Sequence, residues 1–170
     1  MQSGLFQVKN VMSSGASSSI AIEQAKVSDC TECAALLLQQ LAEHGSDATE
    51  ESLVTVLKQV VSNRARGFVL FAHENRKMVG VAYVAIILSA EHGGKVGWLE
   101  ELYVLPEYRS KGVGGTLLTA VLERARGIGI VAIDLEVDEA HRRAEALYTR
   151  FGFRPLERTR WVRKLENQRI

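Results

Sequence analysis

The chain has 170 residues, of which 46% are hydrophobic and 24% charged, a balance typical of one globular domain with a sizeable core. The formal net charge is +1 and no basic stripe is interleaved with aromatic residues, which argues against nucleic acid as a partner. No apolar run reaches the roughly 18 residues of a membrane-spanning helix, so no membrane partner is expected. Residues 1–19 lack a signal-peptide pattern and are interpreted as a flexible lead-in or an added tail before a single domain over 20–170.

The first predicted elements are a strand and a helix. Apolar and polar residues alternate from Ile20 to Lys26, as in a half-buried strand, and Ser28 or Asp29 can cap the helix that follows. This helix carries Cys30 and Cys33 in a C-x-x-C spacing, for which a redox pair or half of a metal site is one interpretation. Because the pair opens a helix and the histidines are scattered singly, we interpret both cysteines as small packing residues. We predict no metal and a cytoplasmic protein without disulfides.

The middle of the chain predicts a second helix and three strands. Apolar residues recur on one helical face over about 49–64. Two strands over 68–73 and 78–88 flank a short polar turn, which indicates a hairpin. After a loop that is interpreted as the tip of a second hairpin, a fourth strand over 96–105 is stopped by Pro106.

The carboxy-terminal part alternates helix and strand. A helix is predicted over 113–126, a strand over 131–137, a helix striped by apolar residues over 144–151 and a last strand over 154–164. The order is therefore β-α-α-β-β-β-α-β-α-β. It predicts an α/β fold with a mixed sheet, in which the helix between the fourth and fifth strands makes a parallel crossover.

The segment LPEYRSKGVGGTLL, residues 105–118, places three glycines at the start of the third predicted helix. The first N–H groups of a helix have no partner within it, and the helix dipole favours an anion there, above all a phosphate. The segment supplies accessible backbone, two cations and a hydroxyl, in Gly112, Gly114, Gly115, Arg109, Lys111 and Thr116. A purely structural turn is the alternative, and phosphate binding is favoured over it.

Two common phosphate motifs do not fit this segment. A P-loop requires a lysine after its last glycine, and a Rossmann fingerprint requires a glycine where Leu117 stands. A nucleotide-phosphate binder of a different fold is therefore the weaker alternative.

The stretch R-S-K-G-V-G, Arg109 to Gly114, resembles the [Q/R]-x-x-G-x-[G/A] signature of the GNAT superfamily of acetyl-CoA-dependent N-acetyltransferases. LEELYVLPEYR is similar to the fourth strand of that family, and AEALYTRFGFRP to its last helix and turn. The order of elements agrees from about residue 20 to 164. The resemblance implies a mostly antiparallel sheet with splayed fourth and fifth strands, and a homodimer formed through residues 158–165.

The resemblance also implies that coenzyme A binds with its pyrophosphate on the glycine loop and its pantetheine arm between the splayed strands. The implied contact residues are Leu102, Tyr103, Val104, Arg109, Ser110, Lys111, Gly112, Val113, Gly114, Gly115, Thr116 and His141. His141 stands where many relatives have an asparagine that bonds the arm, and a surface histidine that opens a helix is the alternative there.

Acetyl transfer to an amine needs a base for the amine proton, a donor for the thioester oxygen and an acid for the leaving thiolate. Relatives carry a glutamate nine residues before the loop arginine, which is Glu100, and we predict it as the base, acting through a water. Glu101 is the second choice, because alternation lets only one of the two face a given cleft. The family implies a backbone N–H near Leu102 as the oxygen's donor and Tyr148 as the acid, although a core tyrosine would fit the same helical stripe.

Acidic residues collect around the predicted cleft: Glu100, Glu101, Asp134, Glu136, Asp138 and Glu139. Their charge favours a small cationic amine as acceptor. Protein N-terminal or lysine acetylation, and an acyl-CoA-binding sensor without turnover, remain alternatives.

Overall fold

The computed structural model describes residues 19–43, 45–137 and 142–165. By internal contacts the chain divides into two compact units, Met1–Glu136 and Val137–Ile170, which are described separately below. None of the helices within the described ranges is long and apolar enough to cross a membrane. The predicted lead-in lies almost wholly outside the described residues.

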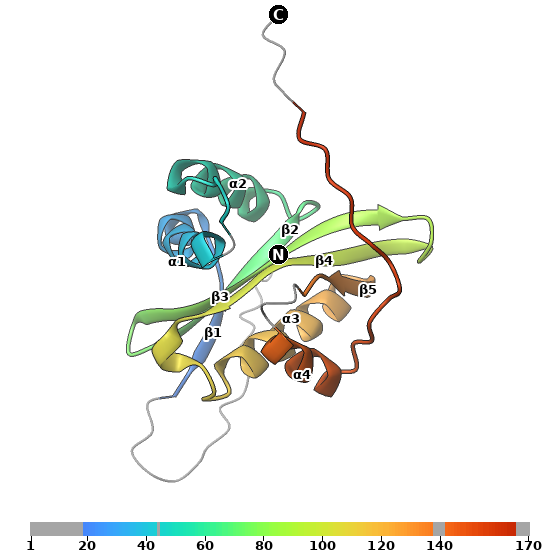
Figure 1. Ribbon diagram of the computed structural model, residues 1–170. Helices are drawn as coiled ribbons and strands as arrows, with labels where there is room; N and C mark the ends of the chain where they lie inside the picture. Colours follow the sequence, from blue (N-terminus) through green and yellow to red (C-terminus); the bar gives the residue numbers. More distant parts are fainter. Residues whose placement is uncertain (1–18, 44, 138–141, 166–170) are drawn as a thin grey trace, which may run out of the picture. The chain divides into compact units, whose positions relative to one another are not determined.

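A five-stranded sheet, with its strands in sequence order, forms the centre of the first unit (Figure 1). Its strands are β1 (Ala21–Gln24), β2 (Gly67–Glu74), β3 (Lys77–Ser89), β4 (Gly94–Val104) and β5 (Ile130–Leu135). The first four pair antiparallel, and β5 joins β4 in parallel. The mixed, mostly antiparallel sheet and its single parallel crossover confirm the predicted fold class.

The β2–β3 connection is a two-residue hairpin turn. Asn75 and Arg76 have φ of 50° and 67°, the positive values that turns of the primed type require. Such a turn matches the twist of its strands, which extend up to Glu74 and from Lys77. The connection between β3 and β4 is also short, so both predicted hairpins are confirmed.

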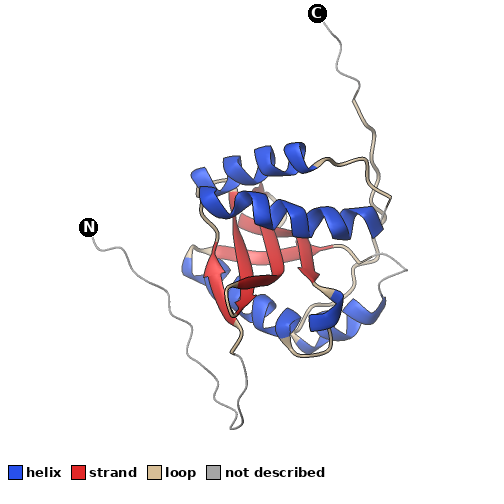
Figure 2. Ribbon diagram, turned by 90° about the vertical axis from the view of Figure 1, so that its left-hand side faces the viewer, coloured by secondary structure: helices blue, strands red, loops and turns tan. Residues whose placement is uncertain are grey.

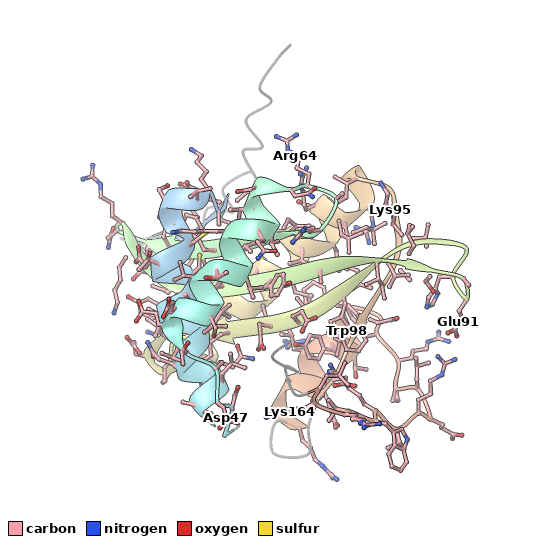
Figure 3. All side chains as sticks on the ribbon, turned by 90° about the horizontal axis from the view of Figure 1, so that it is seen from above. Asp47, Arg64, Glu91, Lys95, Trp98 and Lys164 are labelled. Atoms are coloured by element: carbon pink, nitrogen blue, oxygen red, sulfur yellow. The ribbon has the colours of Figure 1, made fainter. Side chains whose placement is uncertain are left out.

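Three helices cover the two faces of the sheet (Figures 1 and 2). The helices α1 (Cys30–Glu43) and α2 (Glu50–Ser62) pack side by side on one face, and α3 (Val113–Gly127) packs on the other. Thr49 caps α2, because its hydroxyl accepts a hydrogen bond from the Ser52 N–H at 3.2 Å. In Figure 3, Asp47 and Arg64 flank the two ends of α2.

The core between α1, α2 and the sheet is built from apolar side chains with almost no exposure. Leu37, Leu57, Val69 and Val81 are at most 1% exposed, and burial of such a side chain contributes roughly 2 kcal/mol. On the other face α3 approaches closely at Gly80, where an added Cβ would lie 3.0 Å from the Leu117 Cδ1. Helices are therefore fixed against both faces of the strands that carry the candidate site.

The two cysteines belong to this core. Cys30 and Cys33 are free thiols with no exposed surface, and the Cys33 Sγ lies 3.8 Å from the Met78 Sδ. Burial, the largest cause, raises the pKa of the Cys33 thiol to about 12, so it is not a reactive thiolate. The interpretation of the pair as packing residues is confirmed.

The second unit contains the helix α4 (Arg142–Arg150) and an irregular segment. The ring of Tyr148 meets that of Phe153 edge to face, with centroids 5.6 Å apart. The predicted last strand over 154–164 is wrong: residues 153–165 form no regular element, and the Arg158 N–H bonds to the Leu156 carbonyl in a local turn. A strand forms only where a neighbour pairs with it, and α4 offers no such edge. His141 and residues 138–140 lie outside the described residues.

Candidate active site

The glycine loop forms an open turn that leads into α3. Gly112 caps the helix in the left-handed region, with φ of 87°, and a Cβ added there would meet no atom within 4 Å. The first helical bond runs from the Thr116 N–H to the Gly112 carbonyl at 3.0 Å, so the N–H groups of residues 113–115 precede any intrahelical partner. This backbone, with free space above its exposed turn, fits the pyrophosphate of a coenzyme.

The side chains of the loop differ in what they offer an anion. The hydroxyl of Thr116 donates back to the Gly112 carbonyl at 3.2 Å, and so it is turned towards the helix. Lys111 is exposed, and its Nζ lies 5.3 Å from the centre of the Tyr108 ring. Ser110 has a positive φ of 61°, which contributes to the tight turn. Lys111 is therefore an exposed cation beside the helix start.

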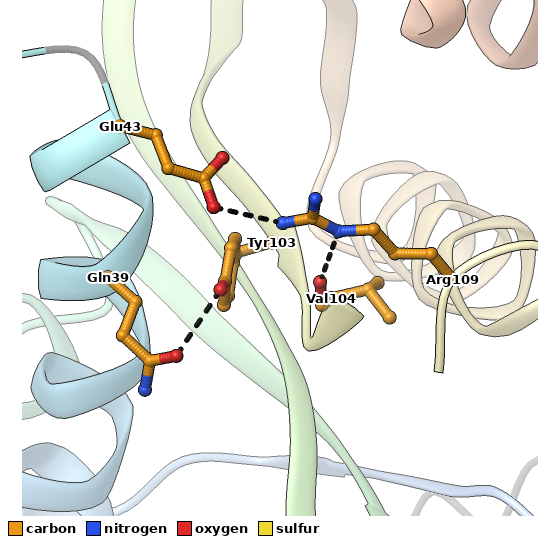
Figure 4. A network of polar contacts seen from close by, with 5 residues as sticks. All are labelled: Gln39, Glu43, Tyr103, Val104 and Arg109. Atoms are coloured by element: carbon orange, nitrogen blue, oxygen red, sulfur yellow. Dashed lines mark hydrogen bonds and ion pairs between the residues drawn. The ribbon is translucent and has the colours of Figure 1, made fainter. Parts of the chain in front are cut away.

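Arg109 points back towards the sheet and α1 (Figure 4). Its Nε donates to the Val104 carbonyl at 2.9 Å, and its Nη2 pairs with the Glu43 carboxylate at 3.3 Å. The guanidinium carbon lies 5.3 Å from the centre of the Tyr103 ring, and the Tyr103 hydroxyl donates to Gln39 at 3.3 Å. This network braces the loop against α1, a role that sequence reasoning missed. A phosphate contact of Arg109 stays a prediction.

The carboxy-terminal half of β4 has a free edge. Pairing with β5 ends at Leu99, opposite Leu135, so residues 100–104 continue without a β5 partner. The Leu105 N–H bonds to Val79 on β3, and alternation therefore aims the backbone groups of Val104 and Leu102 away from β3, towards the free edge. This divergence agrees with the splayed strands that the sequence resemblance implied, and it offers an edge to which an extended arm can hydrogen-bond.

A β-bulge lies at the predicted catalytic glutamates. Leu99 pairs with Val84 and Glu101 with Tyr83, which leaves Glu100 as an extra residue on β4. Tyr83 and Val84 are adjacent on β3, so their side chains face opposite sides of the sheet. The side chains of their partners Leu99 and Glu101 therefore also face opposite sides, although a regular strand places residues two positions apart on the same side. Tyr83 packs against the core cluster under α1 and α2. Glu101 is thereby placed on the face that these helices cover, and the simple alternation assumed through this stretch is wrong.

The two glutamates have different surroundings. Glu100 is exposed, whereas Glu101 is half-buried. Burial, and next the charge of Glu100, raises the pKa of the Glu101 carboxyl to about 7, while a hydrogen bond from the Gln40 side chain opposes the rise. Burial and the same Glu100 charge also raise the pKa of Tyr83. Glu101 therefore changes its protonation near neutral pH, as a general base for an amine should.

Other acidic residues of the predicted cluster lie on or after β5. Asp134 on β5 is half-buried and pairs in register with Trp98 on β4. The His92 Nε2 lies 3.7 Å from the Asp134 Oδ2. Glu136 follows the strand, while Asp138 and Glu139 lie outside the described residues. Within the ranges that the structure describes, no group of three or more His, Cys, Asp or Glu side chains could hold a metal ion.

Tyr148 belongs to the second unit, where it is half-buried on α4. Its carbonyl accepts from the Phe151 and Phe153 N–H groups and so closes the helix. The ring contact with Phe153 shows that part of the side chain packs within its own unit. Its role as an acid stays a prediction.

Comparison with known proteins gives consistent matches. The profile of the acetyltransferase (GNAT) family matches residues 33–153. The chain is 29% identical to the uncharacterized N-acetyltransferase YhfO of Bacillus subtilis, over 78% of this chain and 88% of that protein. It is 30% identical to a glucosamine 6-phosphate N-acetyltransferase of Trypanosoma brucei brucei, over 70% of this chain and 82% of that protein. Three other curated relatives are matched over only 27% to 55% of their own lengths.

Solved structures share the fold. A predicted acetyltransferase of Clostridium acetobutylicum, solved with acetyl-CoA, superposes with a TM-score of 0.72 over 85% of this chain and 96% of that one, at 18% identity. A protein from the mobile metagenome of Cole Harbour Salt Marsh superposes with a TM-score of 0.75 over 85% of this chain and 90% of that one, at 22% identity. At these identities the likeness establishes the fold alone.

Proposed function

Because the chain belongs to the acetyltransferase (GNAT) family, we propose that it transfers the acetyl group of acetyl-CoA directly to the primary amine of a small cationic molecule. One observation carries this proposal. The carboxylate of Glu101, whose pKa is about 7, lies on the part of β4 that β5 leaves free. The accessible start of α3 follows this strand after a short loop. An anion site and a base for an amine thus occur at one strand and its following loop.

Binding of the co-substrate follows from the backbone of this strand and loop. The N–H groups of residues 113–115 would hold the pyrophosphate, with Lys111 as a nearby cation. The free backbone groups of Leu102 and Val104 would pair with the pantetheine arm, and a backbone N–H near Leu102 would donate to the thioester oxygen. Arg109 already occupies one side of the Val104 carbonyl, which leaves its second lone pair for a ligand.

Glu101 is the better candidate for the general base, ahead of Glu100. A lysine-like amine is mostly protonated at neutral pH, so the base must accept a proton under those conditions. A general base works best when its pKa lies near the operating pH, and the pKa of the half-buried Glu101 is raised to about 7. The proton passes from the amine nitrogen to the Glu101 carboxylate, directly or through a water. Glu100 then acts as a charge that keeps the pKa of Glu101 high.

Tyr148 is proposed as the acid that protonates the leaving thiolate. The proposal rests on its position in the family-like sequence AEALYTRFGF and on its phenol, which can donate one proton. His141 is retained as the residue proposed to bond the pantetheine arm in place of the usual asparagine.

The acceptor is proposed to be small and positively charged. Glu100, Glu101 and Asp134 place carboxylates on two adjacent strands, where their charge attracts a cation. One relative is named for glucosamine 6-phosphate, which supports a small primary amine but, because of its anionic phosphate, not the positive charge. A homodimer is proposed through residues 158–165, where Trp161 and Val162 are exposed. A cytoplasmic location is also proposed, because both cysteines are free thiols.

The decisive experiment is an acceptor panel with acetyl-CoA, in which the release of free thiol is measured. The panel should contain polyamines, amino sugars, amino acids and lysine or N-terminal peptides. Turnover with small cationic amines and not with peptides supports the proposal, and the reverse order favours protein acetylation. Binding of acetyl-CoA without thiol release on any acceptor would make the protein a sensor.

A further inference from the structure

The last peptide unit of β4 is fixed from both sides. The Leu105 N–H donates to the Val79 carbonyl on β3 at 3.0 Å, and the Val104 carbonyl accepts from the Arg109 Nε at 2.9 Å. This carbonyl is one of the groups on the free edge of β4 to which the pantetheine arm is proposed to bond. Because Arg109 also opens the segment that leads into α3, its position affects both the end of the edge and the start of the glycine loop.

The remaining contacts of Arg109 tie it to the side of the sheet that α1 covers (Figure 4). Its Nη2 pairs with the carboxylate of Glu43, the last residue of α1, at 3.3 Å, and its guanidinium carbon lies 5.3 Å from the centre of the Tyr103 ring. Tyr103 is only 4% exposed and its hydroxyl donates to Gln39, so its ring is a fixed support. Three contacts thus hold the guanidinium at the end of β4.

We propose that Glu43 is a positioning residue for coenzyme A that acts through Arg109. The carboxylate keeps the arginine on the Val104 carbonyl, and the arginine keeps the end of β4 and the start of the glycine loop in the geometry that the ligand needs. The phosphates are then left to the N–H groups of residues 113–115 and to Lys111. This inference rests on the proposed binding of coenzyme A at this strand and loop.

A direct phosphate contact of Arg109, as the sequence predicts, gives the opposite expectation for Glu43. In that case Glu43 competes with the phosphates for one guanidinium, and its negative charge also repels an anionic ligand. Its removal would release the arginine and tighten binding. If Glu43 is a positioning residue, its removal weakens binding even though the protein becomes more positive. The sign of the change in affinity therefore separates the two roles.

The test uses Glu43→Met, which keeps the length of the side chain and removes the carboxylate. Glu32→Met is the matched control, since Glu32 is an exposed glutamate of the same helix and its loss changes the net charge equally. Calorimetry with coenzyme A gives the Kd of each variant, and thermal unfolding shows that each is folded. For Glu43→Met we expect the Kd to rise about fivefold, the most that an exposed ion pair contributes, and for Glu32→Met by less than about twofold. The KM for acetyl-CoA should rise with the Kd, with little change in kcat.

A double-mutant cycle with Arg109→Met identifies the route of the effect. Arg109→Met should weaken binding at least as much as Glu43→Met, and the double variant should bind no worse than Arg109→Met alone, since the carboxylate acts only through the arginine. An equal further loss in the double variant would contradict this route. Should Glu43→Met fail to fold, Glu43→Gln removes the charge alone and should give a smaller loss of the same sign.

The outcomes separate the inference from the proposed function. Tighter or unchanged binding in a folded Glu43 variant, with normal binding by the wild type, overturns the inference and leaves the proposed function standing. If the wild-type protein does not bind coenzyme A at all, the proposed function fails and the inference fails with it.

Discussion

Replacement of Glu101 by glutamine is expected to stabilise the protein above neutral pH while it removes the proposed catalytic base. The pKa of this carboxyl is about 7 in the folded protein, against an ordinary value of 4.5. Between these two values the folded state binds more protons than the unfolded state. Stability therefore falls as pH rises through that window, because ionisation of the half-buried group becomes a cost of the fold.

The size of the effect follows from the same two values. Each unit of pKa difference corresponds to 1.36 kcal/mol, so the ionised carboxyl destabilises the fold by about 3 kcal/mol. Because the group is partly exposed, solvent screening reduces this to about 2 kcal/mol. Glutamine has nearly the same shape and never ionises. For a chain of this size the gain corresponds to a melting temperature about 4–8 °C higher at pH 8. At pH 4 both proteins are neutral at this position, and no difference is expected.

Thermal unfolding of Glu101→Gln and wild type at pH 4 and pH 8 measures this effect, with Glu123→Gln, which replaces an exposed glutamate on α3, as the control. Turnover of Glu101→Gln should fall by about 10²–10⁴-fold, the range expected for a lost general base. A group that destabilises the fold and serves the reaction is typical of an active site. An equal melting temperature at pH 8, or a gain that is the same at both pH values, would refute a buried, titrating Glu101.

Three further substitutions test the other parts of the site. Glu100→Gln removes the charge that raises the pKa of Glu101, so the acidic limb of the kcat–pH profile should move to lower pH; a 10²-fold loss of turnover instead would make Glu100 the base. Gly114→Glu places charge and bulk at the start of α3 and should abolish coenzyme A binding in calorimetry, whereas Gly127→Glu at the other end of the helix should bind normally. Tyr148→Phe should lower kcat more than it changes the KM for acetyl-CoA, and an unchanged kcat would exclude the acid role.

The parts of the fold that could be predicted from sequence are those set by local patterns. The hairpin at Asn75 and Arg76 follows from two apolar runs with polar residues between them, and the start of α3 follows from glycines placed before an apolar stripe. Residues 154–164 had a pattern compatible with a strand, yet they form none. Formation of a strand depends on a neighbouring edge as well as on composition, and this dependence is invisible in a single segment.

The bulge at Glu100 was beyond sequence reasoning for a related reason. Alternation along β4 places Leu99 and Glu101 on the same face, and no glycine or proline in the stretch WLEEL marks an interruption. Only the pairing with Tyr83 and Val84 reveals the extra residue, and it is the register that moves Glu101 under α1. The two candidate carboxylates could be named from sequence, but the difference in burial between them could not.

Arg109 illustrates the same limit for charge. A cation between a strand and a glycine-rich helix start suggests a phosphate ligand, and the sequence contains nothing that points to Glu43, 66 residues away. In the structure the guanidinium ties the Val104 carbonyl to α1, so the loop that would receive the pyrophosphate is held by a helix of the opposite face of the sheet. An exposed pair of this kind contributes up to about 1 kcal/mol, too little to hold the fold but enough to bias the position of a loop. A substitution of Glu43 on α1 would therefore loosen the loop that is proposed to hold the pyrophosphate without touching the ligand itself.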